Sequence, residues 1–159
     1  LGTTEGRGFE QLMAQLPQER LLIGVYAAAR IERVLKLTLS YVEDRYAFRK
    51  RIADFQNTQF VLAECVTEAT IAKTFLDSCI LEHLESKLTN EKAAMVKYWL
   101  TDLQGKIIDR CLQLFGGYGL MTEYPIERMY RDNRIERIYA GTNEIMKLII
   151  ARSLWEGIS

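Results

Sequence analysis

The sequence predicts an all-α fold, an antiparallel bundle of four main helices with additional short helices. The 159 residues contain only two prolines, Pro17 and Pro125, and the glycines gather near the start of the chain and near position 117. Between these points lie long segments whose apolar residues recur with helical periodicity. Such segments are typical of helices and not of strands.

The first helical part of the chain is divided by Pro17. Residues 9–16 are long enough for two helical turns, and Pro17 either kinks the helix or starts a new one, because proline is best tolerated in a first turn. Good helix formers continue from there to about Tyr46. The basic stretch RYAFRKR, residues 45–51, is expected to connect this helix to the next.

The next helix, from about Thr58 to Leu88, has the clearest pattern. Its apolar residues step by 3, 4, 3, 4 and 3 positions, which places them on one face of a helix that packs in a bundle. These residues are Leu62, Cys65, Ala69, Ala72, Leu76 and Cys79.

The following long helix is expected to begin near Asn90 as its N-cap and to end at the glycines of GGYG, residues 116–119. A turn at Tyr124-Pro125 then leads to a short helix, and a last helix runs from about Thr142 to Glu156. The apolar face of the long helix comprises Val96, Leu100, Leu103, Ile107, Cys111 and Leu114.

Charge, hydropathy and cysteine content argue against several classes of protein. The 21 lysines and arginines balance 21 aspartates and glutamates, whereas a nucleic-acid partner would favour an excess of basic residues. The longest apolar run, LLIGVYAAA, is about half of the roughly 18 residues that a membrane span needs, so no membrane insertion is expected. Three cysteines without metal-ligand spacing predict buried reduced thiols and no metal site.

Three motifs exceed the needs of a plain bundle. LFGGYG has three glycines in four residues, which lets a flat ligand approach the backbone, although helix capping also explains glycine there. Arg45 and the basic residues after it suit a pyrophosphate, although a solvated charge run is the commoner reason for such a cluster. In AGTNEI, Thr142 can cap the last helix and leave N–H groups free for an anion or a carbonyl oxygen.

Together these motifs resemble the C-terminal domain of the acyl-CoA dehydrogenases, over essentially the whole chain. The resemblance runs from GRGFEQLMAQLPQERLLIG through YVEDRYAFRKRIADFQNTQ to LQLFGGYGLMTEYPIERMYRDNRIERIYAGTNEIMKLIIAR. It implies that residues 1–159 form one helical domain. The N-terminal helical domain and the middle β domain of the family are then absent from this chain.

The resemblance also implies an FAD site. Arg45 is similar to the family arginine that reaches the FAD pyrophosphate across a subunit interface, and Phe48 follows it in the same motif. Gln56 is similar to a residue that contacts the adenosine part of FAD. The remaining residues implied are Gln113, Gly116 and Gly117 at the adenosine, and Thr142 and Glu144 near FAD. The common family pattern Phe-Gly-x-Pro-Ile is replaced by residues 48–52, FRKRI, so this loop is expected to run differently.

In many members of the family the position of Ala140 holds a catalytic glutamate. That glutamate removes a proton from the carbon next to the thioester carbonyl, a hydride passes to flavin, and trans-2-enoyl-CoA forms. The isovaleryl-CoA and long-chain branches carry the base instead in a Glu-Arg pair on the first helix, and LPQERLL places Glu19 and Arg20 there. A first-turn acidic residue is also favoured by the helix dipole alone.

By the same resemblance Glu19 is the expected base, and the Ala140 N–H points at the thioester oxygen. Arg20 and Gly141 are expected to contact the substrate. The expected partners are an acyl-CoA, further copies of the chain in a homodimer or homotetramer, and an electron transfer flavoprotein. The expected location is the cytoplasm of a bacterium, or the mitochondrial matrix of a eukaryote. An acyl-CoA oxidase, a flavin monooxygenase and a non-catalytic oligomerisation bundle are the alternatives, and the sequence leaves the acyl chain length open.

Overall fold

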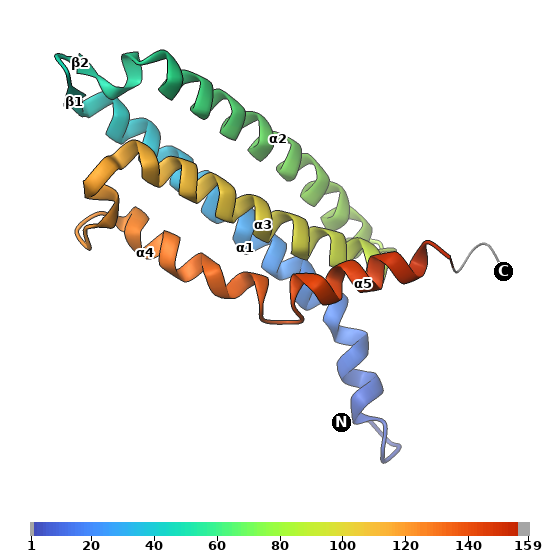
Figure 1. Ribbon diagram of the computed structural model, residues 1–159. Coiled ribbons are helices and arrows are strands. Elements are labelled where there is room, and N and C mark those ends of the chain that lie inside the picture. Colours follow the sequence, from blue (N-terminus) through green and yellow to red (C-terminus); the bar gives the residue numbers. More distant parts are fainter. Residues whose placement is uncertain (1, 156–159) are drawn as a thin grey trace.

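The computed structural model of the protein describes residues 2–155 and confirms the all-α architecture (Figure 1). Three long helices form the body of the molecule, and two shorter helices follow them. The helices are α1 (Gly8–Asp44), α2 (Gln56–Leu84), α3 (Asn90–Phe115), α4 (Pro125–Asp132) and α5 (Asn143–Ser153). The connections contain the strands β1 (Tyr46–Ala47) and β2 (Lys50–Arg51) and the 3-10 helices η1 (Ile52–Asp54), η2 (Gly116–Leu120) and η3 (Asn133–Arg137).

The central helix is α3, which contacts each of the other four α-helices. Figure 1 shows α2 along one side of α3 and α4 with α5 along the other. α1 and α3 run in the same direction, since Arg20 in the first half of α1 contacts Asn90 at the start of α3, and Tyr41 contacts Phe115 near the C-terminal ends of both helices. The core is therefore built around α3. Its fully buried residues include Ala27, Ile31 and Val34 of α1, Cys65 and Cys79 of α2, and Val96, Leu100, Ile107, Ile108 and Cys111 of α3.

Pro17 lies inside α1, which is continuous across it. Figure 1 shows α1 bending, with its first turns pointing away from the bundle. Proline has no N–H to donate to the carbonyl four residues earlier, that of Met13, and its ring crowds that carbonyl, which kinks a helix. Of the two outcomes expected at Pro17, a kink is therefore the one that the molecule adopts.

The remaining helix ends differ from the expected ones by a few residues. α2 runs from residue 56 to 84, and α5 from residue 143 to 153, whereas Glu156 lies outside the described residues. The assignment of Asn90 as the N-cap of α3 is wrong. Thr89 is the N-cap, because its hydroxyl oxygen accepts a hydrogen bond from the Lys92 N–H at 3.3 Å. The three cysteines are buried and free, as predicted.

The basic stretch after α1 forms a β-hairpin with a two-residue turn. Tyr46 pairs with Arg51 and Ala47 pairs with Lys50. The turn residues Phe48 and Arg49 have φ angles of 51° and 64°, both left-handed. Two consecutive left-handed residues define a type I′ turn, in which glycine is favoured at the second position. The arginine at position 49 therefore occupies a strained conformation.

A glycine allows α1 and α3 to approach closely. Gly24 is buried on α1, and a Cβ atom added to it would collide with Cγ1 of Val96 on α3. Leu76 of α2 would also lie within contact distance of that Cβ, at 3.6 Å. The distance between the two helices is therefore set at Gly24.

We predict that Gly24→Ala lowers the free energy of unfolding by about 1–2 kcal/mol, because overpacking outweighs the better helix propensity of alanine. Urea denaturation followed by circular dichroism measures this change. Adding Val96→Ala should reduce the effect of Gly24→Ala, and Gly8→Ala is the control, since a Cβ at Gly8 meets nothing within 4 Å. A Gly24→Ala variant as stable as the wild type would contradict the close packing.

We predict that Arg49→Gly raises the free energy of unfolding by about 0.5–1 kcal/mol, because glycine relieves the left-handed strain but makes the unfolded chain more flexible. The same denaturation measurement applies. The matched control is Lys50→Gly, next in the chain but in the extended strand β2, which should lose stability. Equal losses in both variants would show that the turn conformation carries no strain.

Candidate functional site

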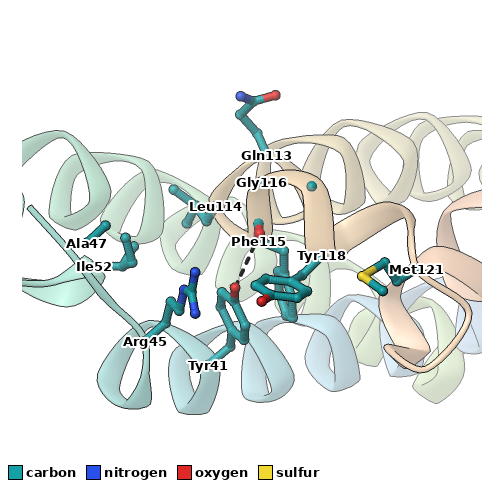
Figure 2. Close-up of a pocket in the computed structure, with 11 residues that line it drawn as sticks. Tyr41, Arg45, Ala47, Ile52, Gln113, Leu114, Phe115, Gly116, Tyr118 and Met121 are labelled. Atoms are coloured by element: carbon teal, nitrogen blue, oxygen red, sulfur yellow. Dashed lines mark hydrogen bonds between the residues drawn. The ribbon is translucent and has the colours of Figure 1, made fainter.

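A pocket of about 620 Å³ opens at the end of the bundle where α1 and α3 both finish (Figure 2). Because the two helices run in the same direction, their last turns lie close together, and the hairpin and η2 contribute the remaining walls. The pocket brings together four of the residues predicted to bind the cofactor, Arg45, Gln113, Gly116 and Gly117. The other lining residues are Tyr41, Ala47, Ile52, Leu114, Phe115, Tyr118 and Met121.

One wall of the pocket consists of packed aromatic rings. The Tyr41 and Phe115 rings stack with their centroids 4.0 Å apart, and the Tyr41 hydroxyl donates a hydrogen bond to the Phe115 carbonyl oxygen at 3.2 Å. Tyr124 meets both rings edge-on. Burial raises the pKa of Tyr41, although nearby Arg45 lowers it, so the hydroxyl stays a neutral donor. This wall is fixed by stacking and by a hydrogen bond.

Arg45 provides a positive charge on the same wall. Its guanidinium carbon lies 4.8 Å from the centroid of the Tyr118 ring, a cation–π contact. Tyr118 stands inside the GGYG motif, and Tyr41 precedes Arg45 by one helical turn. Neither tyrosine was predicted from the sequence. The feature that could have indicated them is their short sequence distance from Arg45 and from the glycines of GGYG.

The two glycines of the pocket face open space. Gly116 ends α3 in the left-handed conformation, with φ of 58°. A Cβ atom added to Gly116 or Gly117 would meet no atom within 4 Å, whereas one added to Gly119 would crowd Leu112 and Phe115. Packing and backbone conformation therefore explain Gly119 and Gly116. No contact among residues 2–155 requires a glycine at position 117, and a ligand that approaches the backbone would.

Four of the predicted cofactor residues lie outside this pocket, and two of them are in the hairpin turn and at the start of α2. Phe48 is 89% exposed in the hairpin turn, and Gln56 is exposed at the start of α2. Gln113 lines the pocket, but Figure 2 shows its side chain directed away from Arg45. The structure thus gathers a cation, aromatic rings and open glycine backbone, and leaves these three side chains at or beyond the rim.

The other predicted residues lie towards the opposite end of α3. Ala140 and Gly141 form a left-handed turn between η3 and α5, with φ angles of 52° and 94°. Thr142 caps α5 as predicted, since its hydroxyl oxygen accepts a hydrogen bond from the Ile145 N–H at 3.4 Å. The turn is half-buried and continues directly into α5.

Buried polar groups of α3 attach this turn to the bundle. The Asn143 amide nitrogen donates hydrogen bonds to Thr101 Oγ1 at 3.0 Å and to Asp102 Oδ1 at 3.1 Å. The Lys97 ammonium donates hydrogen bonds to the Gly141 carbonyl oxygen and to Asn143 Oδ1, each at 2.8 Å. These groups were not predicted from the sequence. The pattern that could have indicated them is a polar stripe beside the apolar face of α3, formed at helical spacing by Lys97, Thr101 and Gln104.

Glu19 and Arg20 point in different directions from α1. Arg20 is 5% exposed, and its Nη1 donates a hydrogen bond to Asn90 Oδ1 at 2.6 Å. Burial lowers the pKa of Arg20, and Glu19 partly offsets this. Glu19 itself is exposed. Arg20 therefore fixes the rotation of this part of α1, and the roles expected for Glu19 and for Arg20 stay predictions.

Glu144 lies in the first turn of α5 with an exposed carboxylate. Hydrogen bonds to its own backbone N–H and to the Thr142 side chain lower its pKa, with Lys147 and Lys97 adding to the effect. A negative charge at the N-terminal end of a helix is favoured by the helix dipole. Glu144 is thus held ionised beside the Thr142 cap, and its predicted place near FAD stays a prediction.

Across residues 2–155 the structure contains no cluster of three histidine, cysteine or acidic side chains that could hold a metal ion. Within the same range, no helix has the length and apolarity that crossing a membrane requires.

Residues 6–155 match the sequence profile of the acyl-CoA dehydrogenase C-terminal domain. The chain belongs to the acyl-CoA dehydrogenase family. The mitochondrial long-chain specific acyl-CoA dehydrogenase of Sus scrofa is 46% identical over 150 residues, which cover 94% of this chain and 35% of that protein. The chain therefore spans about a third of the length of such acyl-CoA dehydrogenases.

Solved structures of acyl-CoA dehydrogenases share the fold. The crystal structure of an acyl-CoA dehydrogenase from Geobacillus kaustophilus is 46% identical, with a TM-score of 0.92, and the match covers 95% of this chain and 40% of that one. An acyl-CoA dehydrogenase of Bacillus anthracis in complex with FAD is 28% identical, with a TM-score of 0.87, over 94% of this chain and 29% of that one. Both matches extend over nearly all of the present helical domain.

Proposed function

We propose that this chain is the C-terminal helical domain of an FAD-dependent acyl-CoA dehydrogenase in which Glu19 is the catalytic base. An N-terminal helical domain and a middle β domain would complete that protein. The observation that carries the proposal is the placement of Glu19. It is an exposed carboxylate on α1, and its neighbour Arg20 contacts the same end of α3 as the Ala140 turn, where the family glutamate is missing.

The placement of Glu19 relative to Ala140 follows from shared contacts with α3. Arg20, next to Glu19, binds Asn90, and Gly141, next to Ala140, binds Lys97. These two α3 residues are seven positions apart, or about 10 Å along the helix axis. Figure 1 shows the turn before α5 and the bent part of α1 at the same end of the bundle. An acyl thioester lying between them could reach both.

The pocket at the other end suits part of FAD. Arg45 would bind a phosphate oxygen, the Tyr118 and Tyr41 rings would offer aromatic surface, and the Gly116-Gly117 backbone leaves room for a flat group. When bound, FAD supplies the acceptor for the hydride that leaves the substrate. Roles for Phe48, Gln56, Gln113, Thr142 and Glu144 near FAD belong to the same proposal.

In the proposed reaction Glu19 takes a proton from the carbon next to the thioester carbonyl. A bound acyl chain would remove water from around the carboxylate, and such desolvation raises a carboxyl pKa towards that of the acidified substrate. The Ala140 N–H would donate a hydrogen bond to the thioester oxygen as negative charge develops on it. Gly141 would lie against the substrate, and the product would be a trans-2-enoyl-CoA.

The proposed partners are an acyl-CoA, other copies of the chain and an electron transfer flavoprotein. Lys97 and Phe115 stand 18 residues apart on α3, so the Ala140 turn and the Arg45 pocket are separated by roughly 27 Å along the axis. This separation supports a homodimer or homotetramer in which Arg45 serves the FAD of a second copy. A half-open apolar groove of about 760 Å³ between α1 and α2 offers surface for such an assembly.

We predict that Glu19→Gln, made in the full-length protein, slows reduction of the flavin by acyl-CoA by roughly 10³–10⁴-fold, because an amide cannot accept the proton. Stopped-flow absorbance of the flavin measures this rate. Glu10→Gln is the control, since Glu10 is an exposed carboxylate on the same helix that pairs with Arg7. Near-normal reduction in Glu19→Gln would refute the assignment of the base.

We predict that Gly117→Leu leaves the helical fold intact but reduces the FAD content of the purified full-length protein several-fold. A Cβ at Gly117 meets no atom within 4 Å, so the added side chain would occupy the pocket without disturbing the core. Flavin absorbance per protein and circular dichroism measure the two effects. Gly8→Leu, at an equally open position on α1, should keep its flavin; full FAD content in Gly117→Leu would exclude this pocket as the cofactor site.

A further inference from the structure

The Ala140-Gly141 turn depends on other parts of the molecule for its shape. Both residues are left-handed, and they join η3 to α5 outside regular secondary structure. A Cβ added to Gly141 would meet Met146 Cε at 2.8 Å. Glycine is the most flexible residue in the backbone, so the direction of the peptide groups in this turn has to be set by contacts from outside it.

Lys97 supplies the contact to the turn itself. It is fully buried on α3, and its ammonium donates one hydrogen bond to the Gly141 carbonyl oxygen and one to Asn143 Oδ1. The Lys97 ammonium thus bridges the turn and the first residue of α5, and it is the group that contacts the Gly141 carbonyl oxygen. Bonds from a charged donor are roughly twice as strong as neutral ones.

Burying an ammonium group is costly, and packing alone would be satisfied by an apolar side chain of the same length. The groups that face Lys97 come from several elements. Asp102 of α3, Glu144 of α5 and Glu136 of η3 favour its charge, and Arg20 of α1 opposes it. Burial is the largest influence and lowers the pKa of Lys97 to about 8, so the side chain is mainly charged at neutral pH.

We propose that Lys97 is a positioning residue for the dehydrogenation, which holds the Ala140-Gly141 turn so that the Ala140 N–H is directed at the thioester oxygen. This inference rests on the proposed function. Removing the cation would leave Gly141 free to rotate, so the N–H would lose its direction while the substrate keeps its other contacts. The chemical step should therefore suffer more than substrate binding.

The test compares Lys97→Met with Lys106→Met in the full-length protein. Methionine fills the volume of the lysine stem without donating hydrogen bonds, and Lys106 is an exposed lysine on the same helix. In Lys97→Met the rate of flavin reduction should fall by about 10- to 100-fold, with KM changed by less than about threefold. Lys106→Met should match the wild type in both quantities.

A second readout follows the enolate directly. An acyl-CoA analogue with an acidified α-carbon is titrated while bound, and its ionisation is recorded by absorbance. Lys97→Met should raise the apparent pKa of this bound analogue by about 1–2 units, the same 10- to 100-fold loss of enolate stabilisation. A purely structural role for Lys97 would leave this pKa unchanged once the variant is shown by circular dichroism and flavin content to be folded.

The wild-type pH profile keeps the proposal testable if Lys97→Met fails to fold. Loss of the Lys97 charge should lower the rate of flavin reduction above a pH of about 8. A rate that does not fall between pH 7 and pH 10 would overturn the inference, as would a folded Lys97→Met variant that reduces its flavin at the wild-type rate. A wild-type protein whose flavin no acyl-CoA reduces would instead overturn the proposed function.

Discussion

The close approach of α1 and α3 at Gly24 sets the relative position of the candidate site residues that these two helices carry. The two helices run in the same direction. Contact at Gly24 therefore fixes Arg45 against the end of α3 and Arg20 against its beginning. α2 connects α1 to α3 in the sequence and lies along one side of α3, and α4 and α5 pack on another side of α3.

The two ends of the bundle are built from different physical interactions. Aromatic stacking, a cation–π contact and open glycine backbone form the pocket at the C-terminal ends of α1 and α3. Buried hydrogen bonds from Asn143 and Lys97 form the support of the Ala140 turn. The first arrangement leaves a surface on which a flat anionic ligand can lie, and the second fixes backbone direction.

The helical fold could be predicted because periodic apolar residues and few breakers dominate the chain. The apolar face of α2 that begins at Leu62, and the end of α3 at GGYG, could be predicted from local sequence patterns alone. The N-cap of α3 was misplaced because Thr89 and Asn90 are both good capping residues, and only the contact of Asn90 with Arg20, 70 positions away, decides between them. The hairpin turn escaped prediction because its left-handed residues are Phe48 and Arg49, where glycine would have marked a turn.

Resemblance and local motifs identified four of the residues that line the pocket, but not the side chains that support them. Tyr41 and Lys97 act through partners more than 40 positions away in sequence, on other helices. Such contacts depend on the rotation of each helix, which short-range pattern does not specify. The sequence thus predicts which groups carry chemistry, and the packing shows which side chains hold those groups in place.

The burial of Lys97 also makes the free energy of unfolding depend on pH. Its pKa is lowered to about 8 in the fold, from an ordinary value of 10.5 in the unfolded chain. Between these two values the unfolded chain binds more protons, so Lys97 makes the free energy of unfolding increase as the pH rises through this interval. At neutral pH the buried charge of Lys97 therefore lowers the free energy of unfolding. The same charge strengthens the hydrogen bonds to Gly141 and Asn143.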